Sequence, residues 1–409
     1  MSAAPGPSSA PRAPFAGRRL WFAGIGGAGL SGYAVVAHAW GAEVAGWDRG
    51  ETPYLAHVRA AGIPVTVAPQ PPAPPAGAEV VVSTAFADRI AGNSRAALLA
   101  ELVAAQPSIV VAGAHGKTTT AAMIAFCLDR LGRDPGFLIG GEVPQLGGNA
   151  RAGSGWLVVE GDESDRTIAA LLPRIAVVTN VDLDHHSEFG SRAEVAALFE
   201  RWLNAVPEVV RGERLAPAAV PLAVPGEHNR RNAACALAAL ELAGVARGEA
   251  EAALAQFTGV GRRFEPRGEA GGVAVVDDYA RNPAKVRAVV DAARERTDGR
   301  VLVLFQPHLY SRTRHAAREL GAALARADAV VVTEVYAARE EPVPGVTGKL
   351  VVDAVSEARP GMHVGWASTV ADGAALVAAA ARPGDLVLTV GAGDVDRAVP
   401  AILDRLRRR

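Results

Sequence analysis

The chain has 409 residues, of which 50% are hydrophobic and 21% charged, and its formal net charge is -1. This length predicts two to four domains with sizeable cores, and the near-zero charge argues against the basic surface that nucleic-acid binding requires. No stretch is long and apolar enough to insert into a membrane, and Cys127 and Cys235 lie in apolar helical contexts, so we expect a cytoplasmic protein with reduced core thiols.

A short tail and a glycine-rich turn begin the chain. Residues 1–17 are rich in Ala, Pro and Ser, and we expect them to form a disordered tail. A strand at 20–23 leads into a glycine-rich turn at 24–32, and a second strand at 43–47 ends at Asp48. This order is typical of a Rossmann-type fingerprint, with the acidic residue placed to meet a ribose or sugar hydroxyl. Alone it leaves a nicotinamide enzyme, a nucleotide-sugar binder and a structural turn open.

A second glycine-containing loop lies between an apolar strand at 108–112 and a helix that begins near Thr119. Its sequence, Gly-Ala-His-Gly-Lys-Thr-Thr-Thr at 113–120, suits the tail of a nucleoside triphosphate, because the helix N-terminus and Lys117 both favour phosphate. The Thr118 hydroxyl suits a Mg2+ ligand. The spacing is shorter than the standard phosphate-binding loop, and an ordinary turn capped by threonines is the alternative.

Acidic and imidazole side chains follow the next two strands. Glu160 ends a strand at 156–160, and His185 follows a strand at 175–179. Because carboxyl ends of parallel strands share one edge of a sheet, both residues could join Thr118 in a Mg2+ site. The alternatives are a solvated acidic loop and a histidine that serves a turn.

The remaining sequence continues the alternation of strand and helix. Asn229 and Asn232 share one face of a helix and could bond an adenine edge, although helix capping is an alternative for Asn229. Polar loops with Gly or Pro follow four further apolar strands, as ligand-binding loops do in open α/β sheets. These strands are expected at 273–276, 301–305, 329–333 and 385–389.

From residue 20 to residue 403, a series of motifs resembles the ATP-dependent Mur ligases of peptidoglycan synthesis. The markers include the glycine turn at 24–32, the loop at 113–120, Glu-Gly-Asp-Glu-Ser-Asp at 160–165 and Val-Val-Asp-Asp-Tyr at 275–279. The resemblance implies an α/β fold of three domains: a Rossmann-like UDP-sugar domain, a trimmed P-loop ATPase domain, and a Rossmann-like closing domain that brings the amino acid. We expect these domains at 18–106, 107–262 and 263–409.

The family's site residues can be carried over motif by motif. The resemblance implies ATP contacts at Gly113, His115, Gly116, Lys117, Thr118, Thr119, Asn229, Asn232, Arg263, Asp278 and Asn282. It implies Mg2+ ligands at Thr118, Glu160 and His185. It implies substrate contacts at Gly24, Gly26, Gly27, Ala28, Gly29, Asp48, Ser83, Thr84 and Tyr310. The expected catalytic residues are Lys117, Glu160, His185, His308 and Arg312.

Within the family, the chain is most similar to the branch that joins L-alanine to UDP-N-acetylmuramate. Sibling branches generally use a carbamoylated lysine as a Mg2+ ligand, and no lysine lies between Lys117 and Lys285. The implied reaction phosphorylates the lactyl carboxylate with ATP, and alanine then attacks the acyl phosphate, releasing ADP and phosphate. The expected partners are these two substrates, with no nucleic acid and no membrane, for a monomer or weak dimer.

Three departures from the branch leave alternatives open. Arg281 and Asn282 stand where two histidines are usual, Leu309 replaces an arginine, and the segment between 203 and 226 is short. A recycling ligase that attaches a preformed peptide and a non-catalytic paralogue that binds a UDP-sugar are the two alternatives.

Overall fold

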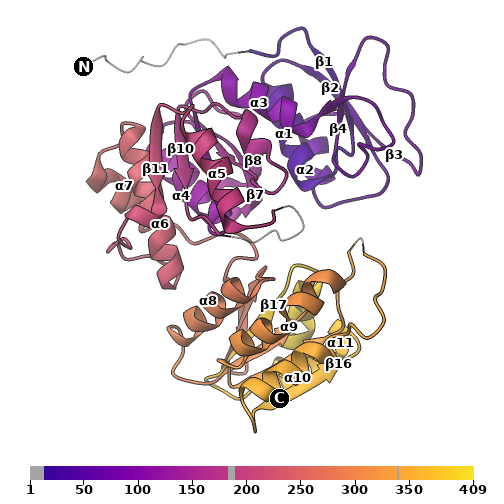
Figure 1. Cartoon of the computed structure of the whole chain (residues 1–409), viewed down its shortest axis with the longest axis vertical. Helices are drawn as coiled ribbons and strands as arrows, with labels where there is room; N and C mark the ends of the chain where they lie inside the picture. Colours follow the sequence, from indigo (N-terminus) through magenta and orange to yellow (C-terminus); the bar gives the residue numbers. More distant parts are fainter. Residues whose placement is uncertain (1–12, 183–188, 339) are drawn as a thin grey trace. The chain divides into compact units, whose positions relative to one another are not determined.

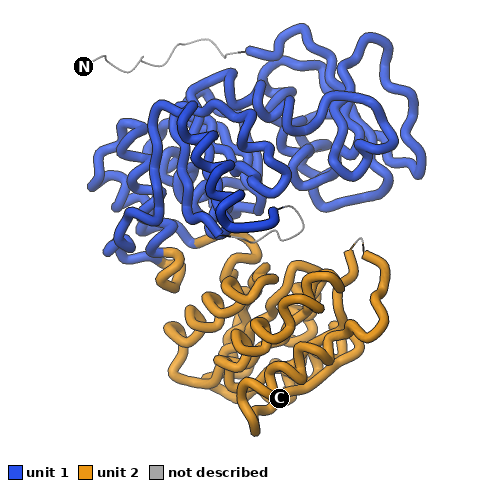
Figure 2. Tube along the Cα trace, in the orientation of Figure 1, with its two compact units in different colours: residues 1–222, 230–258 blue, residues 223–229, 259–409 orange. Residues whose placement is uncertain are grey.

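The computed structural model describes residues 13–182, 189–338 and 340–409. They form two compact units, Met1–Leu222 with Arg230–Thr258, and Ala223–Asn229 with Gly259–Arg409 (Figure 2). The first unit contains two β-sheets and the second contains one (Figure 1). The predicted domain boundaries after residues 106 and 262 fall between these sheets.

The first sheet is parallel, with strand order β3-β2-β1-β4-β5. Its strands are β1 (Arg19–Ala23), β2 (Glu43–Asp48), β3 (Val65–Val67), β4 (Glu79–Val82) and β5 (Asn93–Ser94). The helices between them are α1 (Ala28–Ala39), α2 (Leu55–Ala60) and α3 (Arg95–Ala105). The strand order reverses between β1 and β4, and ligands of open α/β sheets bind at such a switch point. The glycine turn after β1 lies there.

The second sheet has the order β11-β10-β6-β9-β7-β8 and is parallel except for β8, which runs antiparallel to β7. Its strands are β6 (Ser108–Ala112), β7 (Gly136–Val143), β8 (Gly148–Arg151), β9 (Leu157–Glu160), β10 (Ile175–Val178) and β11 (Glu208–Arg211). Its helices are α4 (Lys117–Arg130), α5 (Arg192–Leu203), α6 (Glu227–Leu242) and α7 (Arg247–Leu254). Strand β6 lies between β9 and β10, so the loops after these three strands meet.

The predicted trimming of the central domain concerns the segment between α5 and α6. The described residues there contain β11, which joins the main sheet beside β10, and the 3-10 turn η3 (Gly212–Arg214). No separate side sheet forms in this described segment.

One apolar core runs through the first unit. Buried side chains from both sheets belong to a single cluster, from Phe22 of β1 to Val159 of β9 and Leu198 of α5. Helix α1 approaches strand β8 of the second sheet closely at Gly32, where a Cβ atom would lie 2.9 Å from the Cβ of Ala150. The first and second sheets are therefore held together by a shared hydrophobic core.

The second unit contains a sheet of order β12-β13-β17-β14-β15-β16, in which β12 alone is antiparallel to its neighbour. Its strands are β12 (Glu265–Ala270), β13 (Val273–Asp278), β14 (Val301–Phe305), β15 (Ala329–Thr333), β16 (His363–Ala367) and β17 (Leu386–Val390). Its helices are α8 (Pro283–Arg294), α9 (Tyr310–Leu324), α10 (Lys349–Ala358), α11 (Val370–Ala380) and α12 (Ala398–Arg407). Two apolar clusters, one on each face, pack the helices against the sheet.

Part of the predicted N-terminal tail is folded. Phe15 is buried, its N–H donates to the carbonyl of Trp40 at 3.0 Å, and the two rings lie 6.0 Å apart. The aromatic ring supplies enough buried area to order residues 13–17, despite their Ala- and Pro-rich composition. Cys127 and Cys235 are free and buried, as predicted. Within the described ranges, no helix combines the length and apolar character needed to cross a membrane.

Candidate active site

The loop at 113–118 has the backbone conformation of a phosphate cradle. Gly116 is the N-cap of α4 and has a φ of 81°, a left-handed conformation that favours glycine. A Cβ atom on Gly113, whose φ is 132°, would lie 2.3 Å from the Thr179 hydroxyl. Gly116 has no side chain to cap α4, so the first N–H groups of this helix are available to an anion.

Residues that follow β10 fix the shape of this loop. The Asn180 amide accepts from the N–H of His115 at 3.0 Å and donates to its carbonyl at 2.9 Å. Thr179 donates to the same carbonyl at 2.6 Å. The backbone carbonyl of Asn180 also accepts from Ala114 at 3.3 Å. The loop is therefore held before any ligand binds, which lowers the entropic cost of binding.

Two of the three predicted metal ligands lie together. The Thr118 hydroxyl donates to Oε1 of Glu160 at 3.0 Å, and Oε2 of Glu160 accepts from the Gly140 N–H at 2.8 Å. A hydroxyl and a carboxylate are hard oxygen donors of the kind that Mg2+ prefers. The third predicted ligand, His185, lies outside the described residues. Among the described residues, no group of three His, Cys, Asp or Glu side chains is placed to hold a metal.

Lys117 forms a buried ion pair with Glu163, which the sequence did not single out. Its ammonium donates to the two carboxylate oxygens at 2.8 and 3.0 Å, and the two side chains are 15% and 3% exposed. Burial disfavours the ammonium, but the carboxylates of Glu163 and Glu160 outweigh this effect and raise the pKa of Lys117. Burial also raises the pKa of Glu163, with Lys117 opposing that shift. Lys117 is thus a cation at neutral pH.

The acidic loop after β9 gathers an excess of negative charge around these residues. Asp162 and Asp165 lie 3.7 and 3.0 Å from the guanidinium of Arg95, the first residue of α3. The cluster contains two cations and four carboxylates, so its formal charge is two negative units. Its members are Lys117, Arg95, Glu160, Asp162, Glu163 and Asp165. A divalent cation would balance this charge, which fits the predicted Mg2+.

Three other predicted ATP residues, Asn232, Thr119 and His115, lie in or beside the loop in the first unit. Asn232 of α6 is buried, and its Oδ1 atom would lie 2.1 Å from a Cβ on Gly116. This places the Asn232 amide against the phosphate loop. Thr119 is buried in the first turn of α4, and His115 lies 3.9 Å from Asp182. Asn229, which belongs to the second unit, is the third residue of α6 and so is not its N-cap; its amide donates to the carbonyl of Pro225 at 2.7 Å.

The glycine turn after β1 is shaped by the residues predicted to meet the sugar. One carboxylate oxygen of Asp48 accepts from the Gly26 N–H at 2.8 Å, so Asp48 supports the turn. The Oγ atom of Ser83 is buried and has no hydrogen-bond partner among the described residues. A Cβ on Gly24 would lie 2.5 Å from that atom. An unsatisfied hydroxyl beside the turn is the kind of group that a polar ligand would satisfy.

The remaining predicted residues of this turn start a helix. The N-cap of α1 is Gly27, which has no side chain to cap this helix. The first N–H groups of α1, at Ala28 and Gly29, therefore lack an acceptor within the helix. Thr84, one residue beyond Ser83, is exposed.

In the second unit, Asp278 organises the end of β13. Its carboxylate accepts from the N–H groups of Phe264 and Ala280, each at 2.7 Å. Burial raises the pKa of Asp278 to about 6, against the opposing effect of Arg263. The guanidinium of Arg263 lies 5.0 Å from the Tyr279 ring centroid. Asn282 is the N-cap of α8, since its side chain accepts from the Lys285 N–H at 2.9 Å.

His308 and Arg312 lie together at the start of α9. His308 Nδ1 is 3.4 Å from a guanidinium nitrogen of Arg312, and its ring stacks at 5.8 Å on Tyr336. Leu309, which replaces the expected arginine, has a φ of 69° and is the N-cap of the helix. Tyr310 is the first helical residue. The structure thus brings the two predicted catalytic residues of this unit together.

The sequence did not reveal several residues that complete these arrangements. The Thr179-Asn180 pair directly follows β10, and this position at a strand end is a signal that could have found it. Glu163 and Arg95 act through ion pairs with side chains that are remote in sequence. Gly140 acts through its backbone N–H, for which the sequence contains no signal.

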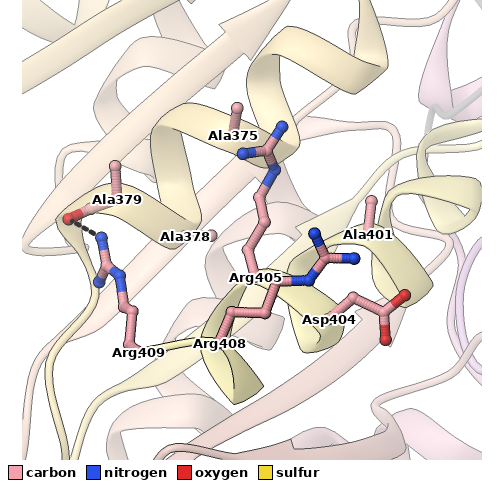
Figure 3. Close-up of a pocket in the computed structure, with 8 residues that line it drawn as sticks. All are labelled: Ala375, Ala378, Ala379, Ala401, Asp404, Arg405, Arg408 and Arg409. Atoms are coloured by element: carbon pink, nitrogen blue, oxygen red, sulfur yellow. Dashed lines mark hydrogen bonds between the residues drawn. The ribbon is translucent and has the colours of Figure 1, made fainter.

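A surface hollow of about 440 Å³ lies between α11 and the end of α12 (Figure 3). Arg409 donates to the carbonyl of Ala379 at its edge, at 2.9 Å. Its lining residues are Ala375, Ala378, Ala379, Ala401, Asp404, Arg405, Arg408 and Arg409. It includes no predicted site residue, so we do not assign the candidate site to it.

Comparison with known proteins gives a consistent family match along the chain. The Mur ligase family catalytic domain matches residues 19–107, and the Mur ligase middle domain matches residues 111–210. The Mur ligase glutamate ligase domain matches residues 262–393. The three matches cover all three sheets in order.

Relatives and solved structures match over nearly the full length. The UDP-N-acetylmuramate–L-alanine ligase of Streptomyces avermitilis is 38% identical, covering 98% of this chain and 100% of the relative. The ligase of the same name from Renibacterium salmoninarum is 42% identical, covering 95% of this chain and 96% of the relative. The structure of the UDP-N-acetylmuramate–alanine ligase from Thermotoga maritima has a TM-score of 0.80 at 26% identity, covering 95% of this chain and 99% of that one. A murein peptide ligase from Psychrobacter arcticus shares the fold, with a TM-score of 0.63 at 22% identity. The chain belongs to the Mur ligase family, as its motifs predicted.

Proposed function

We propose that this protein joins L-alanine to the lactyl carboxylate of UDP-N-acetylmuramate with ATP, through an acyl phosphate. The observation that carries the proposal is the arrangement of Lys117, Thr118 and Glu160 around an uncapped helix N-terminus. A glycine turn for a nucleotide sugar lies in the same unit. The similar proteins from Streptomyces avermitilis and Thermotoga maritima, named for this reaction, support the choice of substrates.

The proposed reaction has two steps, and its reactants are ATP, UDP-N-acetylmuramate and L-alanine alone. A lactyl carboxylate oxygen attacks the γ-phosphorus of ATP, the bond to the β-phosphate oxygen breaks, and ADP leaves. The alanine nitrogen then attacks the acyl carbon, loses a proton, and the tetrahedral intermediate expels inorganic phosphate. A carboxylate alone is a poor acceptor for an amine, so phosphorylation supplies the leaving group.

The residues around the phosphate loop provide positioning and charge for the first step. Lys117 would neutralise charge on the transferring phosphoryl group, and the first N–H groups of α4 would bind phosphate oxygens. Mg2+, when bound, supplies Lewis-acid polarisation of the phosphoryl oxygens. Thr118 and Glu160 would hold this ion, with the Gly140 N–H fixing the orientation of the Glu160 carboxylate.

The other assignments support the same proposal and remain predictions. These are the ATP contacts at Arg263, Asp278 and Asn282, the amino-acid contacts at His308 and Arg312, and the role of His185. The cytoplasmic location and the monomeric or weakly dimeric state also remain predictions.

The test is ADP release with UDP-N-acetylmuramate and a panel of free amino acids, compared with a preformed tripeptide. We expect L-alanine to give the largest stimulation, and Lys117→Met to abolish it. Lys349→Met is the matched control, because Lys349 lies in the second unit over the Trp366 ring, 4.5 Å away. Stimulation by the tripeptide alone would indicate a recycling ligase. Binding of the UDP-sugar without any ADP release would indicate a non-catalytic paralogue.

A further inference from the structure

Arg95 links the glycine turn of the first sheet to the acidic loop of the second. It is the first residue of α3, where Ser94 is the N-cap and its side chain accepts from the Ala97 N–H. The guanidinium Nη2 atom donates to Asp165 at 3.0 Å and lies 3.7 Å from Asp162. The side chain is 26% exposed, so it is held in a largely buried position.

The other side of the same guanidinium faces the glycine turn. A Cβ atom on Gly29 would lie 3.2 Å from Arg95 Nη1, so glycine permits this approach. The Nε atom of Arg95 is buried and has no hydrogen-bond partner among the described residues. The Nε–H lies on the guanidinium edge that it shares with Nη2, so this donor points to the Asp165 side, whereas Nη1 approaches the turn.

The surroundings of Nη1 favour an anionic acceptor. The uncapped start of α1 presents N–H groups at Ala28 and Gly29 on the same turn. Tyr33, one turn further along α1, is neutral at pH 7 and adds no negative charge. Burial raises its pKa further, to about 12. Three polar groups thus lie around this turn: Arg95, the N-terminus of α1 and the unsatisfied Ser83 hydroxyl.

We propose that Arg95 binds the diphosphate of the nucleotide sugar at the glycine turn. This inference rests on the proposed function, which assigns the turn to a UDP-sugar. Nη1 would donate to a phosphate oxygen at the turn, while Nη2 stays paired with Asp165. The competing role is a purely structural clamp, in which Arg95 only joins α3 to the acidic loop.

Two substitutions separate the two roles. Arg95→Ala removes both the clamp and the phosphate contact, whereas Asp165→Asn removes the clamp and leaves the guanidinium. We expect Arg95→Ala to raise the dissociation constant for UDP by about tenfold to a hundredfold, the effect of losing a charge-assisted hydrogen bond. Asp165→Asn should bind UDP as tightly as the wild type or more tightly. In Arg95→Ala, the dissociation constant for ATP should change less than that for UDP, because the ion pairs of Arg95 are with Asp162 and Asp165.

Isothermal titration with UDP, UDP-N-acetylmuramate and ATP measures these constants, with thermal unfolding as the fold check. Arg59→Ala is the matched control, because Arg59, which lies on α2, forms an exposed ion pair with Glu51. If Arg95→Ala does not fold, Arg95→Lys keeps a charge beside Asp165 without the planar fork and should also weaken UDP binding.

Three results would overturn the inference. Equal weakening of UDP binding by Arg95→Ala and Asp165→Asn would show a clamp, and unchanged UDP binding in Arg95→Ala would show no contact. A loss seen with UDP-N-acetylmuramate but not with UDP would place the lactyl carboxylate, instead of the diphosphate, at Arg95. If the wild-type protein binds neither ligand, the proposed function fails together with the inference, which distinguishes that case from the others.

Discussion

Replacing Lys117 by methionine should destabilise the first unit strongly, because it leaves the Glu163 carboxylate buried without its counter-ion. The Glu163 side chain is 3% exposed, and the ammonium of Lys117 donates to its two oxygens. Breaking a buried ion pair from one side costs about 3–5 kcal/mol of unfolding free energy. Methionine keeps the apolar length of the side chain, so loss of packing contributes little.

Protonation of Glu163 limits the loss and gives it a pH dependence. Neutralising a carboxyl of ordinary pKa at pH 7 costs roughly 3–4 kcal/mol, which is close to the expected penalty. Burial raises the pKa of Glu163 in the folded protein, and removing Lys117 removes the opposing effect. A raised pKa in the folded state gives a stability contribution that is present at low pH and lost as the pH rises. The deficit of the Lys117→Met variant should therefore shrink as the pH falls from 7 towards 5.

Urea unfolding followed by circular dichroism measures these differences. The double variant Lys117→Met/Glu163→Gln removes both charges, so it should recover most of the stability that Lys117→Met loses. Lys349→Met, which removes an exposed lysine, should change the unfolding free energy by less than about 1 kcal/mol. A loss below about 1 kcal/mol in Lys117→Met, or no recovery in the double variant, would refute the reasoning.

Three further predictions follow from the two units. Glu160→Gln should raise the Mg2+ concentration for half-maximal ADP release by at least about tenfold, whereas Asp129→Asn, remote from the loop, should not. Asp278 has its pKa raised to about 6 by burial, so it destabilises the folded state as the pH rises above the ordinary pKa of a carboxyl. The stability of Asp278→Asn relative to wild type should rise by about 1–3 kcal/mol between pH 4 and 7, measured by urea unfolding; a constant difference would contradict this. Asn282→Ala should cost about 1 kcal/mol through loss of the α8 cap, and Asn282→Ser should restore most of it; equal losses would argue against capping.

The strands that carry the site were predictable because they are short apolar runs buried in the sheets. The predicted strands at 108–112, 301–305 and 329–333 have the same bounds in the structure. The glycine loops that follow β1 and β6 were also predictable, because Gly116 adopts a left-handed conformation that other residues avoid. Such local signals, taken in sequence order, predicted the three-domain Mur ligase fold, and the family matches confirm it.

Edge strands and ion pairs were not predictable in the same way. The strand β5 has two exposed residues, and β12 is largely exposed, so neither shows an apolar pattern. Lys117 and Glu163 are 46 positions apart, and Arg95 and Asp165 are 70 apart. Their pairing depends on how the first residues of α4 and α3 meet the acidic loop after β9, which the residue types alone do not specify.

The most direct test of the proposed reaction follows the oxygen atoms of the substrate. UDP-N-acetylmuramate labelled with heavy oxygen in its lactyl carboxylate is incubated with the protein, ATP, Mg2+ and L-alanine, and the released phosphate is analysed by mass spectrometry. Attack of the carboxylate on ATP predicts one labelled oxygen in the inorganic phosphate for each amide bond formed. Unlabelled phosphate, with ADP released at the same rate without L-alanine, would contradict the central claim.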